Sequence, residues 1–185
     1  ARLLELCEPL HPIVFNDLFC LSDPRVDTIS VGAARPSDLD RHLQALELLE
    51  QAPELVGPIA QRLQQGLSER LGEDWLQSWQ EGLPSWNDTP GDINLPVLLW
   101  LHTLLQGWDL ESFAQARYGL LGNGSHWFPG RNANRFEAGP SEPDAVSEAQ
   151  LLEVLSASPW QQQIPGILRQ MKARLGQKTV KRLGP

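Results

Sequence analysis

The stretch NLPVLLWLHTLLQ, residues 94–106, decides the fold class of this chain. Asparagine is one of the residue types that cap helix N-termini, so Asn94 is a candidate cap. Pro96 lies in the expected first turn, where proline is tolerated because the backbone N–H groups of that turn have no partner within the helix. The run from Val97 to Gln106 is rich in leucine, as is the whole chain. We therefore predict a helix here, and signals of the same kind recur on both sides of it.

Toward the C-terminus, the sequence predicts further helices separated by turns. Three are expected: from a cap at Asp109 to about Tyr118, over Leu151–Leu155 behind a capping box at Ser147–Gln150, and from Pro165 to Leu175. Gly122–Ser125 has the composition of a turn. Arg131–Asp144 is polar and contains glycine and proline, which favours a mobile loop.

Toward the N-terminus, the signals change. Trp75–Asp92 is rich in Trp, Gly, Pro and Asn, which indicates an ordered loop. Before it, Pro58 is expected to open a helix whose apolar residues repeat every four positions.

The first fifty residues have the pattern of a helix, a strand and a helix. A broad apolar face predicts a helix over His11–Leu21, and the β-branched run Val26–Val31 predicts a short strand. Ser37 and Asp40 form the expected capping pair of the next helix. Its apolar residues recur at helical spacing: Leu39, Leu43, Leu46 and Leu49. Parallel strands occur in sheets that are covered on both faces. A lone strand of this kind therefore makes the helix–strand–helix segment look incomplete.

The charge balance narrows the range of partners and compartments. The 185 residues carry a formal net charge of −8, which argues against non-specific binding to nucleic acid or to an anionic membrane.

No stretch reaches the roughly 18 apolar residues of a membrane span, and the N-terminal residues do not resemble a signal peptide. The only cysteines are Cys7 and Cys20. We expect a cytoplasmic protein with reduced thiols.

Residue spacing gives no catalytic or metal-ligating constellation. The histidines are dispersed and have no ligand spacing with either cysteine: His11, His42, His102 and His126. Neither a G-x-G-x-x-G nor a P-loop pattern is present. The seven tryptophans stand mostly at predicted helix ends and loops, where they are expected to pack loops onto helices. We therefore assign no catalytic residue and no metal ligand.

One local feature offers a specific chemistry. The turn Gly32–Arg35 follows the predicted strand and leads into the helix at Ser37, so its backbone N–H groups and the positive end of the helix dipole suit an anion. Arg35 and Arg41 would add charge-assisted hydrogen bonds. The competing interpretation is an ordinary connection between a strand and a helix.

Two sets of segments resemble a known family. Pro12–Ser22, Val26–Ala34 and Pro36–Asp40 resemble the last helix, strand and helix of aldo/keto reductases. The second set resembles the ferredoxin-like extension that one branch of this family carries at its C-terminus: Asp92–Pro96, Ala116–Tyr118, Gly124–Gly130 and Ile164–Pro165. The most specific element is the run His126–Gly130.

The resemblance implies a mainly α fold, in which an α–β–α remnant of the end of a (β/α)8 barrel precedes a helical C-terminal domain. Residues 1–52 would be the barrel remnant, residues 53–81 a helical linker, and residues 82–185 the extension. The family's catalytic Tyr, Lys, Asp and His lie on earlier barrel strands, and none of those strands is in this chain.

The resemblance also implies a site for NADP(H). In the family, the last strand-to-helix loop binds the adenosine phosphate end of the cofactor. The corresponding residues here are Gly32, Ala33, Ala34, Arg35, Asp38 and, in the following helix, Arg41. The family often has a Glu–Asn pair where this chain has Arg41 and His42, which leaves the cofactor preference open.

The extension departs from its relatives in its cysteines. Those relatives carry C-x2-C-x2-C-x3-C-P runs, whose thiolates ligate iron–sulfur clusters. The matching segments of this chain, Leu83–Pro90 and Phe136–Pro159, contain no cysteine. We therefore expect no iron–sulfur cluster in this chain.

Two functions stay open at this point. The chain is the C-terminal part of an NADP(H)-linked oxidoreductase that is inactive without the remaining barrel, or it is a non-catalytic helical module that docks on a partner protein. The predicted lone strand suits both functions because it requires a partner. Expression of the chain alone, followed by NADPH titration, addresses the first function.

Overall fold

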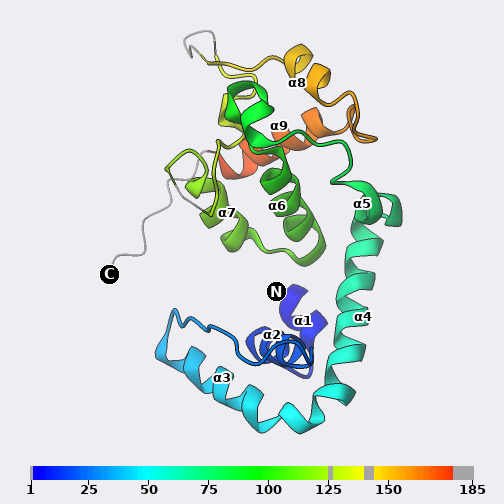
Figure 1. Ribbon diagram of the computed structural model, residues 1–185, viewed down its shortest axis with the longest axis vertical. Helices are drawn as coiled ribbons and strands as arrows, with labels where there is room; N and C mark the ends of the chain where they lie inside the picture. Colours follow the sequence, from blue (N-terminus) through cyan, green and yellow to red (C-terminus); the bar gives the residue numbers. More distant parts are fainter. Residues whose placement is uncertain (1, 125–126, 140–143, 177–185) are drawn as a thin grey trace. The chain divides into compact units, whose positions relative to one another are not determined.

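The computed structural model of the chain describes residues 2–124, 127–139 and 144–176. These residues are mainly helical, as predicted, and none of them lies in a β-strand. They contain two isolated β-bridges, Ile93 with Arg131 and Phe136 with Val146. The chain divides into two compact units, residues 1–70 and 71–185 (Figure 1), and each unit is described by itself. Ser125 of the predicted turn, His126 of the run that resembles the ferredoxin-like extension, and residues 140–143 of the predicted loop lie outside the described ranges.

The first unit is built from four α-helices and one 3-10 turn within its described residues. They are α1 (Arg2–Cys7), α2 (Pro12–Leu21), α3 (Pro36–Glu47), η1 (Leu49–Gln51) and α4 (Ala52–Leu71). Its buried apolar residues are few: Cys7, Leu10, Val14, Leu18, Ala45, Ala52, Ile59 and Leu63. α1 lies against α4, where the Arg62 side chain donates a hydrogen bond to the carbonyl of Leu6 at 3.1 Å. This core is small because much of the leucine face of α3 lies outside it.

The second unit surrounds α6. Its helices and 3-10 turns are α5 (Glu73–Ser78), η2 (Trp86–Asp88), η3 (Pro90–Asp92), α6 (Leu95–Trp108), α7 (Glu111–Leu120), η4 (Ala133–Arg135), α8 (Glu148–Val154) and α9 (Ile164–Leu175). α6 packs against α7 and α9, and it buries apolar side chains around much of its circumference: Leu95, Leu98, Leu99, Leu101 and Leu105. A helix that is apolar over so much of its surface is typical of a domain centre.

Two predicted helix caps are confirmed. The Asn94 side chain accepts a hydrogen bond from the backbone N–H of Val97 at 3.1 Å. At the start of α8, the hydroxyl of Ser147 accepts from the N–H of Gln150 at 3.3 Å, while the Gln150 side chain accepts from the N–H of Ser147 at 2.9 Å. Both caps satisfy backbone donors that a helix start otherwise leaves unpaired.

Three predicted helix starts are wrong. Pro58 lies inside α4, which begins at Ala52, so the carbonyl of Glu54 has no N–H partner at position 58. Asp109 adopts the left-handed region (φ 55°) and ends α6, a conformation that aspartate tolerates better than most residues. At α3, the cap is Arg35, and the carboxylate of Asp38 accepts from the N–H groups of Ala34 and Arg35 just before the helix, so the helix does not begin with the predicted pair Ser37–Asp40.

The predicted strand does not form. Residues 26–31 are neither strand nor helix. Among the described residues, the one backbone hydrogen bond of this segment is from the N–H of Val26 to the carbonyl of Asp23, at 2.9 Å. A β-branched run cannot build a ladder without a neighbouring strand, and no described segment supplies one. The assignment of residues 1–52 to the end of a barrel therefore stays a prediction.

Two predicted loops contain more structure than expected. Within Trp75–Asp92, the last four residues of α5 and the turns η2 and η3 are helical. Within Arg131–Asp144, the described part holds η4, and the Ala133 and Phe136 side chains are fully buried. The apolar residues anchor these polar segments, so composition alone underestimated their order. The structure also divides the predicted linker of residues 53–81 between the two units, at residues 70 and 71.

Candidate functional site

The predicted anion-binding turn lies at the N-terminus of α3. Within it, the Asp38 carboxylate accepts hydrogen bonds from the backbone N–H groups of Ala34 and Arg35, at 2.9 and 3.0 Å. Gly32 and Ala33 precede these donors and are exposed. An internal carboxylate therefore occupies the donors that the sequence assigned to a bound anion, and it uses the same attraction to the helix N-terminus.

The two arginines of the predicted site are both exposed. Arg35 forms no ion pair with any described residue, and Arg41 donates one hydrogen bond, to the Gln44 side chain at 3.1 Å. Most of their N–H donors are therefore open to solvent. The guanidinium groups fit a phosphate, whereas the Asp38 carboxylate repels one, so the turn suits the predicted ligand only in part.

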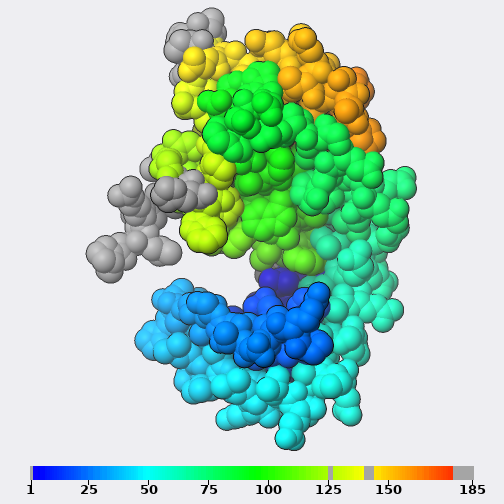
Figure 2. Space-filling view, viewed as in Figure 1, coloured from blue at the N-terminus to red at the C-terminus, as the bar shows by residue number. Residues whose placement is uncertain are grey.

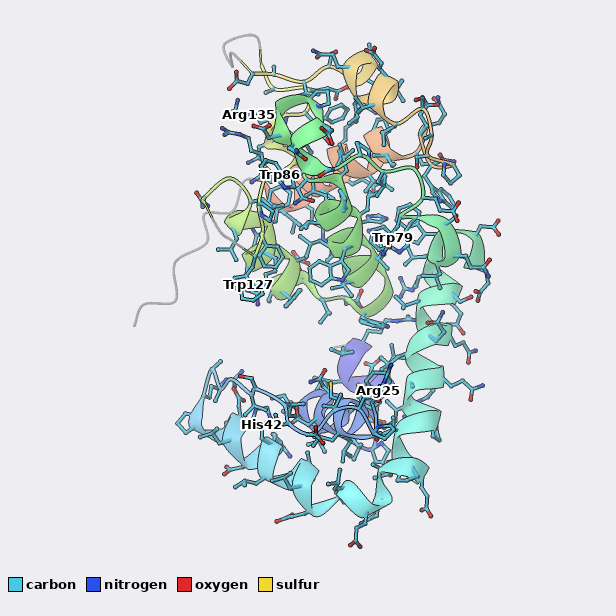
Figure 3. The ribbon with its side chains drawn as sticks, viewed as in Figure 1. Arg25, His42, Trp79, Trp86, Trp127 and Arg135 are labelled. Carbon is cyan, nitrogen blue, oxygen red and sulfur yellow. The ribbon has the colours of Figure 1, made fainter. Side chains whose placement is uncertain are left out.

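A pair that the sequence did not indicate holds this turn in place. The His42 Nδ1 atom of α3 lies 2.5 Å from the Oδ2 atom of Asp17 in α2, and Asp17 is 3% exposed. His42 is labelled in Figure 3. Its other ring nitrogen lies 3.4 Å from the carbonyl oxygen of Gly32. One imidazole therefore connects α2, α3 and the turn.

The hydrogen bond to Asp17 raises the pKa of His42, and the nearby carbonyl of Gly32 acts in the same direction. A protonated His42 donates from both ring nitrogens, which matches its two oxygen neighbours. No sequence signal marks this pair, because its members are 25 positions apart and each is an ordinary polar residue of a helix.

A groove of about 550 Å³ lies between residues 27–31 and α3. Asp17 and His42 line it on one side, together with the apolar side chains of Ile29, Leu39 and Leu43. Leu39 is 52% exposed, Leu43 60% and Leu46 58%. The blue and cyan surface in Figure 2 belongs to this unit. The leucines that predicted α3 correctly thus face outward for much of their area.

In the second unit, an aromatic cluster is centred on Trp75. The Trp75 ring meets the rings of His102 and Trp160 edge to face, at centroid distances of 5.6 and 5.1 Å, and stacks on Trp79 at 6.5 Å. The Trp75 indole N–H donates to the Thr103 hydroxyl at 3.0 Å. Burial lowers the pKa of His102 to about 4. The predicted packing role of tryptophan is confirmed here, since these rings belong to the core.

Trp127 is the exception among the tryptophans, with 88% of its surface exposed.

Across the described ranges, no group of three or more His, Cys, Asp and Glu side chains is placed to hold a metal ion. None of the helices described has both the length and the apolar character of a membrane span.

Comparison with known proteins leaves the family of this chain open, so the resemblance to aldo/keto reductases stays a prediction. The geometry above supplies two features that bear on function: an outward leucine face beside an unpaired segment, and a turn with two open guanidinium groups. No protein-family model, curated protein or solved structure matches the chain.

Proposed function

We propose that this chain is the C-terminal part of an NADP(H)-linked oxidoreductase of the aldo/keto-reductase type, in which residues 1–52 complete a barrel formed by other polypeptide. The observation that carries the proposal is the outward leucine face of α3 next to residues 27–31. Exposed leucines in a continuous row are typical of a surface that another protein segment covers.

The unpaired segment supports the same conclusion. Residues 27–31 make no backbone hydrogen bond with the described part of the chain. Their N–H and C=O groups are therefore open to pairing with a strand, which is how a parallel sheet would take up this segment. A partner strand would pair with residues 27–31 and also exclude water from the groove beside Leu39 and Leu43.

In this proposal the turn holds the phosphate of the adenosine end of NADP(H). The Arg35 and Arg41 guanidinium groups would donate to phosphate oxygens, and the N–H groups of Gly32 and Ala33, in the same turn as Arg35, would add further donors. Asp38 must give up its backbone donors or remain as a repulsive neighbour. The cofactor would supply hydride when bound to the complete barrel, and this chain would contribute binding rather than proton transfer.

A titration with 2′,5′-ADP, the phosphate-bearing fragment of the cofactor, tests the site. Amide resonances of Ala33, Ala34 and Arg35 are followed by NMR in the full chain. The double variant Arg35→Gln/Arg41→Gln should weaken binding by about tenfold or more. Asp38→Asn removes the competing charge and should strengthen it. Arg25→Gln is the matched control, because Arg25 is an exposed arginine of the same unit whose partner is Asp23.

Equal binding by the double variant and the parent chain would rule out this phosphate site. Weaker binding by Asp38→Asn would mean that Asp38 organises the turn for another purpose. We further expect no NADPH-dependent aldehyde reduction by the chain alone, measured against a boiled control. We also expect no stoichiometric iron or acid-labile sulfide, measured after anaerobic reconstitution.

The second candidate is a non-catalytic helical module that docks on a partner protein through the same leucine face. The exposed leucines favour this docking function as strongly as the first function, because either a barrel or another protein could cover them. The titration separates the two functions. Loss of 2′,5′-ADP binding in the arginine variant supports the oxidoreductase, whereas no binding by the parent chain leaves the docking module.

A further inference from the structure

Arg117 of α7 lies between two aromatic rings. Its guanidinium carbon is 4.8 Å from the ring centroid of Phe113 and 5.6 Å from that of Phe128. Trp100 supports both rings, since it stacks on Phe128 at 6.4 Å and meets Phe113 edge to face at 5.8 Å. These three rings pack against the buried core of the second unit. Arg117 is therefore held by a rigid aromatic frame.

Stacking of this kind leaves the donors of the guanidinium unused. Rings that stack on a guanidinium contact its faces, and its N–H groups lie in its plane as a fork that matches a carboxylate. Arg117 makes no hydrogen bond and no ion pair with any residue in the described ranges. The aromatic rings fix the position of its guanidinium group, whose N–H donors have no acceptor among the described residues.

The other arginines of this unit behave differently. Those within the described residues all pair with carboxylates: Arg131 with Asp92, Arg135 with Asp144, Arg169 with Glu137 and Glu148, and Arg174 with Glu111. The chain has 23 acidic residues against 15 basic ones, so internal acceptors are plentiful. An arginine that is fixed by aromatic rings and lacks a carboxylate here is therefore available to an acceptor from another molecule.

Trp127 extends this surface. It precedes Phe128 in sequence, and 88% of its surface is exposed. Trp127 is labelled in Figure 3. The segment that carries it is anchored, because the Asn94 side chain donates to the carbonyl of Pro129 at 2.8 Å. Gly130 (φ +75°) lies so close to the carbonyl of Asp92 that an added Cβ atom would be 2.8 Å from it. Trp127 thus lies two residues before an anchored stretch of backbone.

We infer that Arg117 and Trp127 form a docking site for an acidic protein segment. A carboxylate of the partner accepts two parallel hydrogen bonds from the Arg117 fork, and a neighbouring apolar side chain covers the Trp127 ring. Arginine and tryptophan are side chains that often dominate protein interfaces. Here Trp127 directly precedes Phe128, one of the two rings that contact Arg117. Charge complementarity selects the occupant, since Arg117 is a cation that has no carboxylate partner among the described residues. This site lies in the second unit and does not depend on the proposed oxidoreductase function.

The test is a titration of the full chain with the capped peptide Glu-Glu-Phe-Glu-Glu, with Gln-Gln-Phe-Gln-Gln as its uncharged counterpart. The indole N–H resonance of Trp127, identified with Trp127→Phe, should shift with the acidic peptide alone. Arg117→Gln should weaken binding by about tenfold or more, and Arg117→Lys should also weaken it because lysine lacks the fork. Arg131→Gln, which removes a paired arginine of the same unit, should bind as the parent chain does.

Three results would overturn the inference: unchanged binding by Arg117→Gln, equal binding of the uncharged peptide, or tighter binding of a single-stranded oligonucleotide at the same resonance. The last result would identify the site as one for phosphates of a nucleic acid. The indole resonances of the other tryptophans check that each variant is folded.

Discussion

The Nδ1 atom of His42 lies 2.5 Å from the Oδ2 atom of Asp17, and this contact joins two helices that are separated by 25 positions in the sequence. Asp17 is buried, so its carboxylate has little water to stabilise it and depends on this partner. The contact also fixes the ring of His42 against the carbonyl of Gly32. The geometry of the turn before α3 is therefore linked to the protonation of one histidine.

The first prediction follows from the raised pKa of His42. The unfolded chain releases this proton near pH 6.5, whereas the folded chain keeps it to a higher pH because of the hydrogen bond to Asp17. The stabilisation is complete below about pH 6.5 and is lost as pH rises through the raised pKa. Hydrogen exchange of α2 and α3, corrected for intrinsic rates, should show the first unit opening more readily from pH 6 toward pH 9.

His42→Gln should remove this pH dependence, and Arg25→Gln, an exposed control in the same unit, should retain it. Identical pH profiles for the parent chain and His42→Gln would show that the pair does not couple proton binding to folding.

The second prediction concerns His102 and has the opposite sign. His102 is 8% exposed, and its Nδ1 atom has no hydrogen-bond partner in the described part of the chain. Burial lowers its pKa to about 4, so the unfolded chain binds the proton at a higher pH than the folded chain does. The second unit should lose stability as pH falls from about 6.5 to 4, by about 3 kcal/mol in total.

Tryptophan fluorescence measures this change separately, because all seven tryptophans, from Trp75 onward, belong to the second unit. Urea unfolding at several pH values should give a steeper decline for the parent chain than for His102→Leu. If both proteins lose stability equally between pH 6.5 and 5, acidic groups elsewhere account for the decline.

The parts of the fold that the sequence predicted are those that depend on neighbours within a few positions. The caps at Asn94 and Ser147 involve a side chain and an N–H group three residues later, so local sequence specifies them. The periodicity of α3 likewise predicted a helix. Whether its leucines are covered depends on segments distant in sequence, which periodicity does not encode.

The misses share this cause. The turn Gly32–Arg35 was predicted from local pattern, but the contact of Asp17 with His42 and the assembly around Arg117 join separate segments. Trp127 was expected to pack like the other tryptophans and instead faces solvent. The lone strand failed because β-structure requires a partner that the described residues do not provide.

The third prediction compares two glycines of the second unit. Gly82 has φ +67°, and an added Cβ atom would overlap the carbonyl group of Ala157. Gly82→Ala should therefore lower the free energy of unfolding by about 3 kcal/mol or more, from backbone strain and the clash together. Gly166 lies within α9 and has no atom within 4 Å of its added Cβ. Gly166→Ala should raise the stability by about 0.5–1 kcal/mol.

Urea unfolding followed by tryptophan fluorescence measures both variants on the same transition. A neutral effect of Gly82→Ala would mean that the segment after α5 does not approach Ala157 as closely as the structure has it.

The last prediction tests the outward leucine face of α3, on which both candidate functions depend. Leu39, Leu43 and Leu46 are each more than half exposed. Each single change to Gln should alter the stability of the first unit by no more than about 0.5 kcal/mol, measured by hydrogen exchange of α2 and α4. Leu18→Ala, in the buried core of the same unit, is the contrasting control and should cost about 2–5 kcal/mol.

The triple variant carrying all three glutamines should stay folded but lose association through this face, whether with a barrel, another protein or itself, as measured by sedimentation velocity. Retained folding with lost association is the result expected if another protein covers these leucines, because leucines that serve binding contribute little to the stability of the isolated fold. If the triple variant instead unfolds the first unit, the leucines belong to the unit's own core. The need for a covering partner would then disappear, and with it the observation on which both candidate functions rest.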